Sequence, residues 1–160
     1  MVGKRMFKTA EKKLYEYQLL LCQIEAYEQD KGITKKLDMN SFIKSKGRTS
    51  DPTGAAASAE ITEPKNITAA RGWVWAIEHA LERHKQEDAE KGIECGKAYL
   101  MKEYFMMDCL NTTKVRNAMS RAVDVMIKAN IGERTFYDWK REVVQSVVYG
   151  AIQDGTLKAY

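Results

Sequence analysis

The chain has 160 residues, of which 44% are hydrophobic and 30% charged, and its formal net charge is +4. That length supports one soluble domain, and two prolines among many helix-favouring residues predict an all-α protein. No apolar run approaches the roughly 18 residues of a membrane span, and the N-terminal residues lack the apolar core of a signal peptide. We therefore expect a cytoplasmic protein without membrane contact.

Charge is distributed unevenly along the chain. Residues 1–50 carry 11 Lys and Arg against 6 Asp and Glu, and residues 109–160 carry 8 against 5. The middle of the chain, residues 51–108, carries 7 against 11. Basic ends suit a polyanion such as DNA, whereas an acidic middle suits protein contacts or plain solvation.

Residues 1–30 are predicted to form one amphipathic helix that ends near Lys31 and Gly32, because glycine often terminates helices. The helix either buries its apolar face within the protomer or forms the seam of a homodimer. Its apolar side chains recur at intervals of three and four residues and include Phe7, Ala10, Leu14, Tyr17, Leu21 and Ile24.

Residues 31–66 read as a basic, partly irregular arm or linker, with a short helix near Asp38–Lys44. Lys46 and Arg48 belong to its basic residues, and Ser50-Asp51-Pro52 is a turn signal. The arm could contact the DNA backbone or the minor groove. The alternative is a solvated connector, and composition alone favours that alternative.

Residues 67–160 are predicted to form a helical domain. Its first helix, capped by Asn66 or Thr68, runs to about Lys91 and ends in a solvated charged segment, Lys85–Lys91. A dense aromatic and methionine cluster in residues 93–108 is typical of core. The buried face of the first helix is expected to carry Trp73, Ile77, Ala80, Leu81 and His84.

A helix-turn-helix is predicted at about residues 114–149. Its first helix presents an apolar face that includes Ala118, Met119, Ala122, Val125 and Met126, and the turn comprises Asn130–Gly132. The second helix, predicted to end near Tyr149, buries Phe136, Trp139, Val143 and Val147. Its polar side carries Glu133, Arg134, Tyr137, Asp138 and Arg141.

In DNA-binding proteins with this motif, the N-terminal part of the second helix enters the major groove. The alternative is a helical hairpin in an ordinary bundle, with a solvated charged face. The pattern alone leaves both interpretations open.

No motif for catalysis or metal binding stands out. Phosphate-binding glycine loops, nucleophile elbows and zinc-protease motifs do not occur in the sequence. Cys22, Cys95 and Cys109 are an odd number without a C-x-x-C pair, which argues against disulfides and zinc. His79 and His84 are five positions apart, and nothing in the spacing places a nucleophile beside either. We therefore expect no enzymatic activity, no metal and no cofactor.

Two stretches together carry a family resemblance. One is Arg48-Thr-Ser-Asp-Pro-Thr-Gly-Ala-Ala-Ala57, and the other is Asn130-Ile-Gly-Glu-Arg-Thr-Phe-Tyr-Asp-Trp-Lys-Arg-Glu142. Their order resembles the phage late-gene transcription activators of the RinA and ArpU kind, whose C-terminal region is similar to region four of bacterial sigma factors. The resemblance implies a double-stranded DNA-binding activator of phage late genes in the bacterial host cytoplasm. It also implies host RNA polymerase as a partner.

The resemblance also assigns roles to single residues. Gly132 stands where such proteins often have a Ser or Thr cap. Arg134 can read guanine, and Glu133 or Asp138 can accept from cytosine N4. Lys128 and Lys140 are then placed for phosphate, while Ile131, Phe136 and Trp139 serve as buried supports.

Two competing functions stay open beside the activator. One is a DNA-binding phage packaging subunit of the small-terminase kind, which would form a ring. The other is a helical adaptor that binds only protein.

Overall fold

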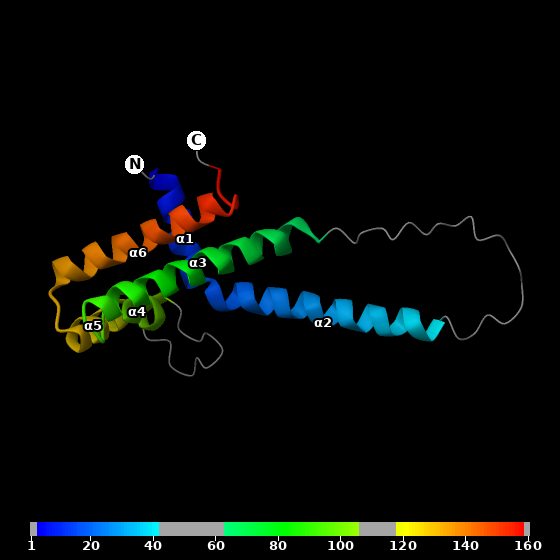
Figure 1. Cartoon of the computed structure of the whole chain (residues 1–160), viewed down its shortest axis with the longest axis horizontal. Helices are drawn as coiled ribbons and strands as arrows, with labels where there is room; N and C mark the ends of the chain where they lie inside the picture. Colours follow the sequence, from blue (N-terminus) through cyan, green and yellow to red (C-terminus); the bar gives the residue numbers. More distant parts are fainter. Residues whose placement is uncertain (1–2, 42–62, 106–117, 159–160) are drawn as a thin grey trace, which may run out of the picture.

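The computed structural model describes residues 3–41, 63–105 and 118–158, and every regular element in these ranges is helical (Figure 1). The expected all-α class is confirmed. Lys46, Arg48 and the Ser50-Asp51-Pro52 turn lie outside the described residues. The elements are α1 Lys4–Tyr15, α2 Tyr17–Ser41, α3 Lys65–Glu90, α4 Lys97–Leu100, the π-helical turn η1 Met101–Phe105, α5 Ala118–Ala129 and α6 Glu133–Gln153.

Two long helices, α3 and α6, form the centre of the molecule. α2 packs along α3, α1 packs against α6, and α4 with η1 joins α3 to the α5–α6 end (Figure 1). α3 and α6 approach closely at Gly150, which has no side chain. A Cβ at this position would lie only 3.3 Å from the backbone and side chain of Ala76. The predicted end of this helix near Tyr149 was wrong, since α6 continues through Gly150 to Gln153.

The N-terminal region differs from the single helix that was expected. The helix breaks at Glu16, whose φ of −89° and ψ of 5° end α1 before α2 begins at Tyr17. The predicted stop at Lys31 and Gly32 was also wrong, because α2 continues to Ser41. A glycine inside a helix costs only about 1 kcal/mol, which a helix of 25 residues can absorb.

The apolar face of α3 is as predicted, whereas both of its ends differ. Trp73, Ile77 and the other members of the expected face are buried. Pro64, not Asn66 or Thr68, occupies the N-cap position. The charged C-terminal segment is not wholly solvated, because Asp88 is 8% exposed and accepts a 2.9 Å hydrogen bond from the backbone N–H of Ala98. Asp88 thus holds the start of α4 against the end of α3.

One continuous apolar core links the helices. α1, α2, α3, α4, η1, α5 and α6 all contribute buried side chains to it. An aromatic group at one end joins three elements: Tyr104 and Phe105 of η1 contact Tyr15 of α1, and Tyr104 meets Phe136 of α6 edge to face. Within the residues described, no helix combines the length and the apolar composition that a membrane crossing requires.

Candidate nucleic-acid interface

A three-residue turn joins α5 to α6 and fixes how α6 is presented. Asn130 adopts a φ of 50°, in the left-handed region that asparagine tolerates better than most residues. The N–H of Ile131 donates to the carbonyl of Met126 at 3.0 Å, and the N–H of Asn130 donates to the carbonyl of Ile127 at 3.2 Å. These two bonds form a Schellman C-cap, which satisfies the last carbonyls of α5. Gly132 is then extended and begins α6 without a side-chain cap.

The inner side of α6 packs against the core of the protein. Phe136 is 1% exposed, and Val143 and Val147 are fully buried. Trp139 and Ile131, which were expected to be buried, are only partly buried and pack at the edge of the core. The orientation of the first half of α6 is therefore determined mainly by Phe136.

The five predicted reading residues lie together on the exposed side of the first half of α6. Tyr137 is 52% exposed, and the side chains of Asp138 and Arg141 are 50% and 64% exposed. Arg141 Nη1 lies 3.7 Å from Asp138 Oδ1, which is a loose, solvated ion pair that contributes little to stability. Glu133 and Arg134, at the very start of the helix, are also exposed.

The two lysines expected at phosphates occupy different environments. Lys128 is exposed, with its Nζ 5.9 Å from the ring centre of Tyr99, and the interaction with Tyr99 raises its pKa. Lys140 is partly buried, pairs with Glu11 of α1 at 2.7 Å, and lies over the rings of Tyr104 and Phe105. Lys140 therefore joins α6 to α1 and η1, and we leave it out of the candidate surface.

An exposed apolar stripe on α5 was not anticipated. Met119 is 77% exposed, Val123 is 42% exposed and Ile127 is 72% exposed. The expected buried face of α5 was wrong for Ala118 and Met119, which are exposed, and of the α5 residues only Val125 is fully buried. The signal in the sequence was the spacing of Met119, Val123 and Ile127, four residues apart on one side. A hollow of about 470 Å³ lies between α5 and α6 beside this stripe.

A buried polar contact between α3 and α6 was missed as well. His84 is 2% exposed, and its Nε2 lies 3.1 Å from the Oγ of Ser146. Its Nδ1 is buried 3.4 Å from a carboxylate oxygen of Glu87, without a well-formed hydrogen bond. Burial lowers the pKa of His84. A hollow of about 250 Å³ adjoins the contact, with Lys97 and Glu142 on its wall.

The order Ser146, His84, Glu87 resembles that of a nucleophile, a base and an orienting carboxylate, but the surroundings do not suit acyl transfer. Ser146 lies inside α6, where its Oγ donates to the carbonyl of Glu142 at 3.0 Å. Backbone N–H groups within a helix are already paired, so they offer no donors to a developing oxyanion. We assign the contact to packing between helices. In the described part of the chain, no group of three or more His, Cys, Asp or Glu could hold a metal ion.

No protein-family model, no curated protein and no solved structure matches this chain.

Proposed function

We propose that this protein binds double-stranded DNA in a sequence-specific manner, with α5 and α6 acting as a helix-turn-helix. The observation that carries the proposal is the cluster of exposed polar and aromatic side chains on the first half of α6. The Schellman turn presents this cluster and Phe136 supports it from behind. A DNA-reading helix requires a rigid support and a solvent-facing row of hydrogen-bonding groups near its N-terminus.

The residue chemistry suits the major groove. Arg134 can donate two hydrogen bonds to guanine, and Glu133 or Asp138 can accept one from the amino group of cytosine. Tyr137 offers a hydroxyl and a flat ring, and Arg141 is an exposed cation on the same face of α6. Lys128 is an exposed cation near the end of α5, before the turn. Two acidic and three basic side chains leave this surface with a net charge of only +1. It is thus better suited to reading bases than to binding DNA by charge alone.

The biological role that we propose is transcription regulation, as an activator of phage late genes. Host RNA polymerase as a partner and binding as a homodimer belong to the same proposal. This part is supported by the family resemblance of the two sequence stretches, the second of which includes the first half of α6.

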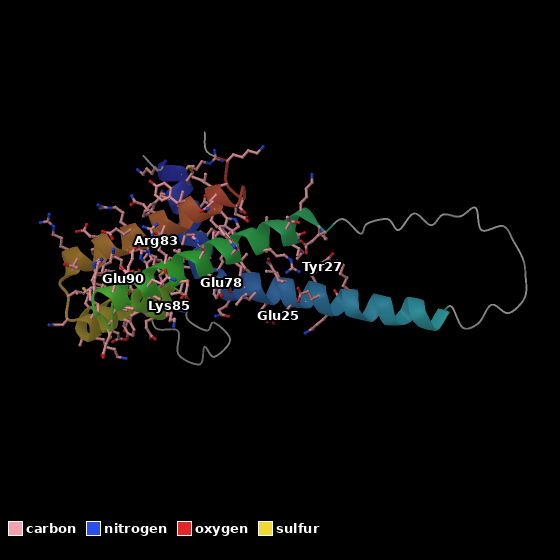
Figure 2. The ribbon with its side chains drawn as sticks, viewed as in Figure 1. Glu25, Tyr27, Glu78, Arg83, Lys85 and Glu90 are labelled. Atoms are coloured by element: carbon pink, nitrogen blue, oxygen red, sulfur yellow. The ribbon has the colours of Figure 1, made fainter. Side chains whose placement is uncertain are left out.

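The proposal predicts that Arg134→Ala weakens binding to the preferred site by about 1–3 kcal/mol, because a guanine contact is lost. The preferred site would first be selected from random-sequence duplexes. Affinities for that site and for an unselected duplex would then be measured by fluorescence anisotropy. Arg83→Ala is the matched control, because Arg83 is an exposed arginine on α3 whose ion pair with Glu87 links neighbouring turns of one helix (Figure 2).

The expected result is a loss of discrimination in Arg134→Ala and none in Arg83→Ala, with both variants as helical as the parent by circular dichroism. If the two variants lose discrimination between the duplexes equally, or if neither loses it, Arg134 does not read a base. Failure of the selection to enrich any sequence would count against sequence-specific binding altogether.

A helical protein adaptor is the second candidate, and the exposed stripe of Met119, Val123 and Ile127 favours it. Contiguous exposed apolar side chains commonly mark sites of protein contact. An adaptor would show no affinity for duplex DNA, and Arg134→Ala would leave its partner binding unchanged. The same binding measurements therefore separate the two functions.

A further inference from the structure

The outer face of α1 carries a row of positive charge. Lys4, Arg5, Lys8 and Lys12, here called the cationic stripe, are all exposed. At 3.6 residues per turn they fall within a sector of about 100° around the helix axis. The opposite side of α1 is occupied by the core, where Ala10 and Leu14 are fully buried.

Little negative charge offsets this row. The described part of the chain provides no ion pair for Lys4, Arg5 or Lys8, while Lys12 makes a solvated pair with Glu16 at 3.5 Å. The one carboxylate within α1, that of Glu11, instead pairs with Lys140 of α6. Three lysines of the stripe recur about once per turn, roughly 6 Å apart along the helix.

The stripe continues the candidate DNA surface of α6. Ser146 and Gly150 face α3, since they contact His84 and Ala76. By helical geometry, Val144 and Val148 lie on the side of α6 away from α3, in line with Tyr137 and Arg141. Both valines are fully buried, and after α3, α1 is the helix that packs most extensively against α6. We infer from this geometry that α1 covers part of the second half of the α6 side whose first half carries the reading residues. Figure 1 shows α1 crossing α6.

We propose that the cationic stripe of α1 contacts the phosphate backbone of duplex DNA beside the segment that α6 reads. This inference rests on the proposed function and adds a second, sequence-independent contact to it. Lysines suit phosphates because each behaves as a mobile point charge that needs no fixed geometry.

The packing of α1 distinguishes this ligand from an anionic membrane. A basic helix that binds a membrane surface inserts its apolar face into the lipid. In α1 that face is already used, because Ala10 and Leu14 are buried in the core and Met6 and Phe7 pack at its edge. Only the charged side is free to meet a partner, which fits a rigid polyanion.

The test compares the parent with a stripe variant, Lys4→Gln, Arg5→Gln and Lys8→Gln combined. The control variant is Lys65→Gln, Lys85→Gln and Lys91→Gln, which removes the same charge from exposed positions at α3 and its C-cap. Lys85 is labelled in Figure 2. Binding to a mixed-sequence duplex and to the selected site is measured over a range of salt concentrations. Binding to phosphatidylserine vesicles is measured in parallel.

Each lost phosphate contact makes the slope of log K against log salt shallower by about 0.9, so the stripe variant should change it by about 2.7. Over a fourfold rise in salt, the parent would then lose about 40-fold more affinity than the stripe variant. The ratio of selected-site to mixed-sequence affinity should stay as in the parent. The control variant should keep the parental slope.

The outcomes separate the two proposals. A parental slope in the stripe variant overturns the stripe contact, even where site preference persists. An equal change of slope in stripe and control variants also overturns it, as does stripe-dependent binding to vesicles without any to DNA. Stripe-dependent binding with no preferred site supports the stripe contact and overturns the sequence-specific function. Absence of any duplex binding by the parent overturns both.

Discussion

His84 is the residue whose chemistry depends most on the fold. Its ring is enclosed between α3 and α6, with Glu87 and Arg83 from its own helix. Lys97 and Glu142 approach from α4 and α6. Burial disfavours the protonated ring and lowers its pKa in the folded state. In the unfolded chain the ring should titrate near its ordinary value of about 6.5.

The stability of the protein should therefore fall as the pH drops below about 6.5. In that pH range His84 is protonated more readily in the unfolded state than in the folded state, so protonation favours unfolding. Urea unfolding of the parent at about pH 7 and at about pH 5 measures this loss. His84→Gln, which keeps a donor for Ser146 but cannot titrate, should reduce the pH dependence. The exposed His79 provides the control as His79→Gln, and an identical pH dependence in parent and His84→Gln would contradict the prediction.

At the scale of helices, the pair of Glu11 and Lys140 joins α1 to α6. The ammonium of Lys140 is partly buried, so burial on its own lowers the pKa of this lysine. The hydrogen bond to Glu11 and the neighbouring charge outweigh burial and raise the pKa. A Lys140 without Glu11 would be a partly desolvated charge lacking its partner.

Glu11→Gln should accordingly destabilise the fold by about 1–3 kcal/mol, which is the range for a hydrogen bond to a charged group in a partly buried setting. Chemical denaturation followed by circular dichroism measures this change. Glu94→Gln at an exposed position is the control and should stay close to the parent. A stability unchanged by Glu11→Gln would mean that solvent screens the pair completely.

Helix faces could be predicted from sequence, but contacts between helices could not. The buried face of α3 and the turn at Asn130 follow from local periodicity and backbone preference, which a few neighbouring residues determine. Met119 was misjudged, and the contacts of Lys140 with Glu11 and of Ser146 with His84 could not be anticipated, because these environments are set by residues distant in sequence. Gly32 was taken as a stop because a helix-ending glycine looks the same in sequence as one that a helix tolerates.

For the molecule as a whole, the continuous core predicts a single unfolding transition. Buried side chains from α1 to α6 belong to one cluster, which includes Trp73 at 6% exposure. Tryptophan fluorescence and far-ultraviolet circular dichroism should therefore show coincident midpoints in urea. An earlier midpoint by fluorescence would indicate that the α3–α6 contact opens before the helices melt.

The length of α2 affects the frictional drag on the molecule in solution. α2 runs along α3. The hydroxyl of Tyr17 donates a 2.9 Å hydrogen bond to Glu78, and the guanidinium of Arg71 donates one of 2.8 Å to Glu28. The last turns of α2 project beyond the first residue of α3, Lys65 (Figure 1). An elongated particle experiences more frictional drag than a sphere of equal mass, and a monomer would leave a sizing column early. Light scattering or sedimentation equilibrium, which report mass independently of shape, is therefore the way to distinguish a monomer from a dimer or a ring.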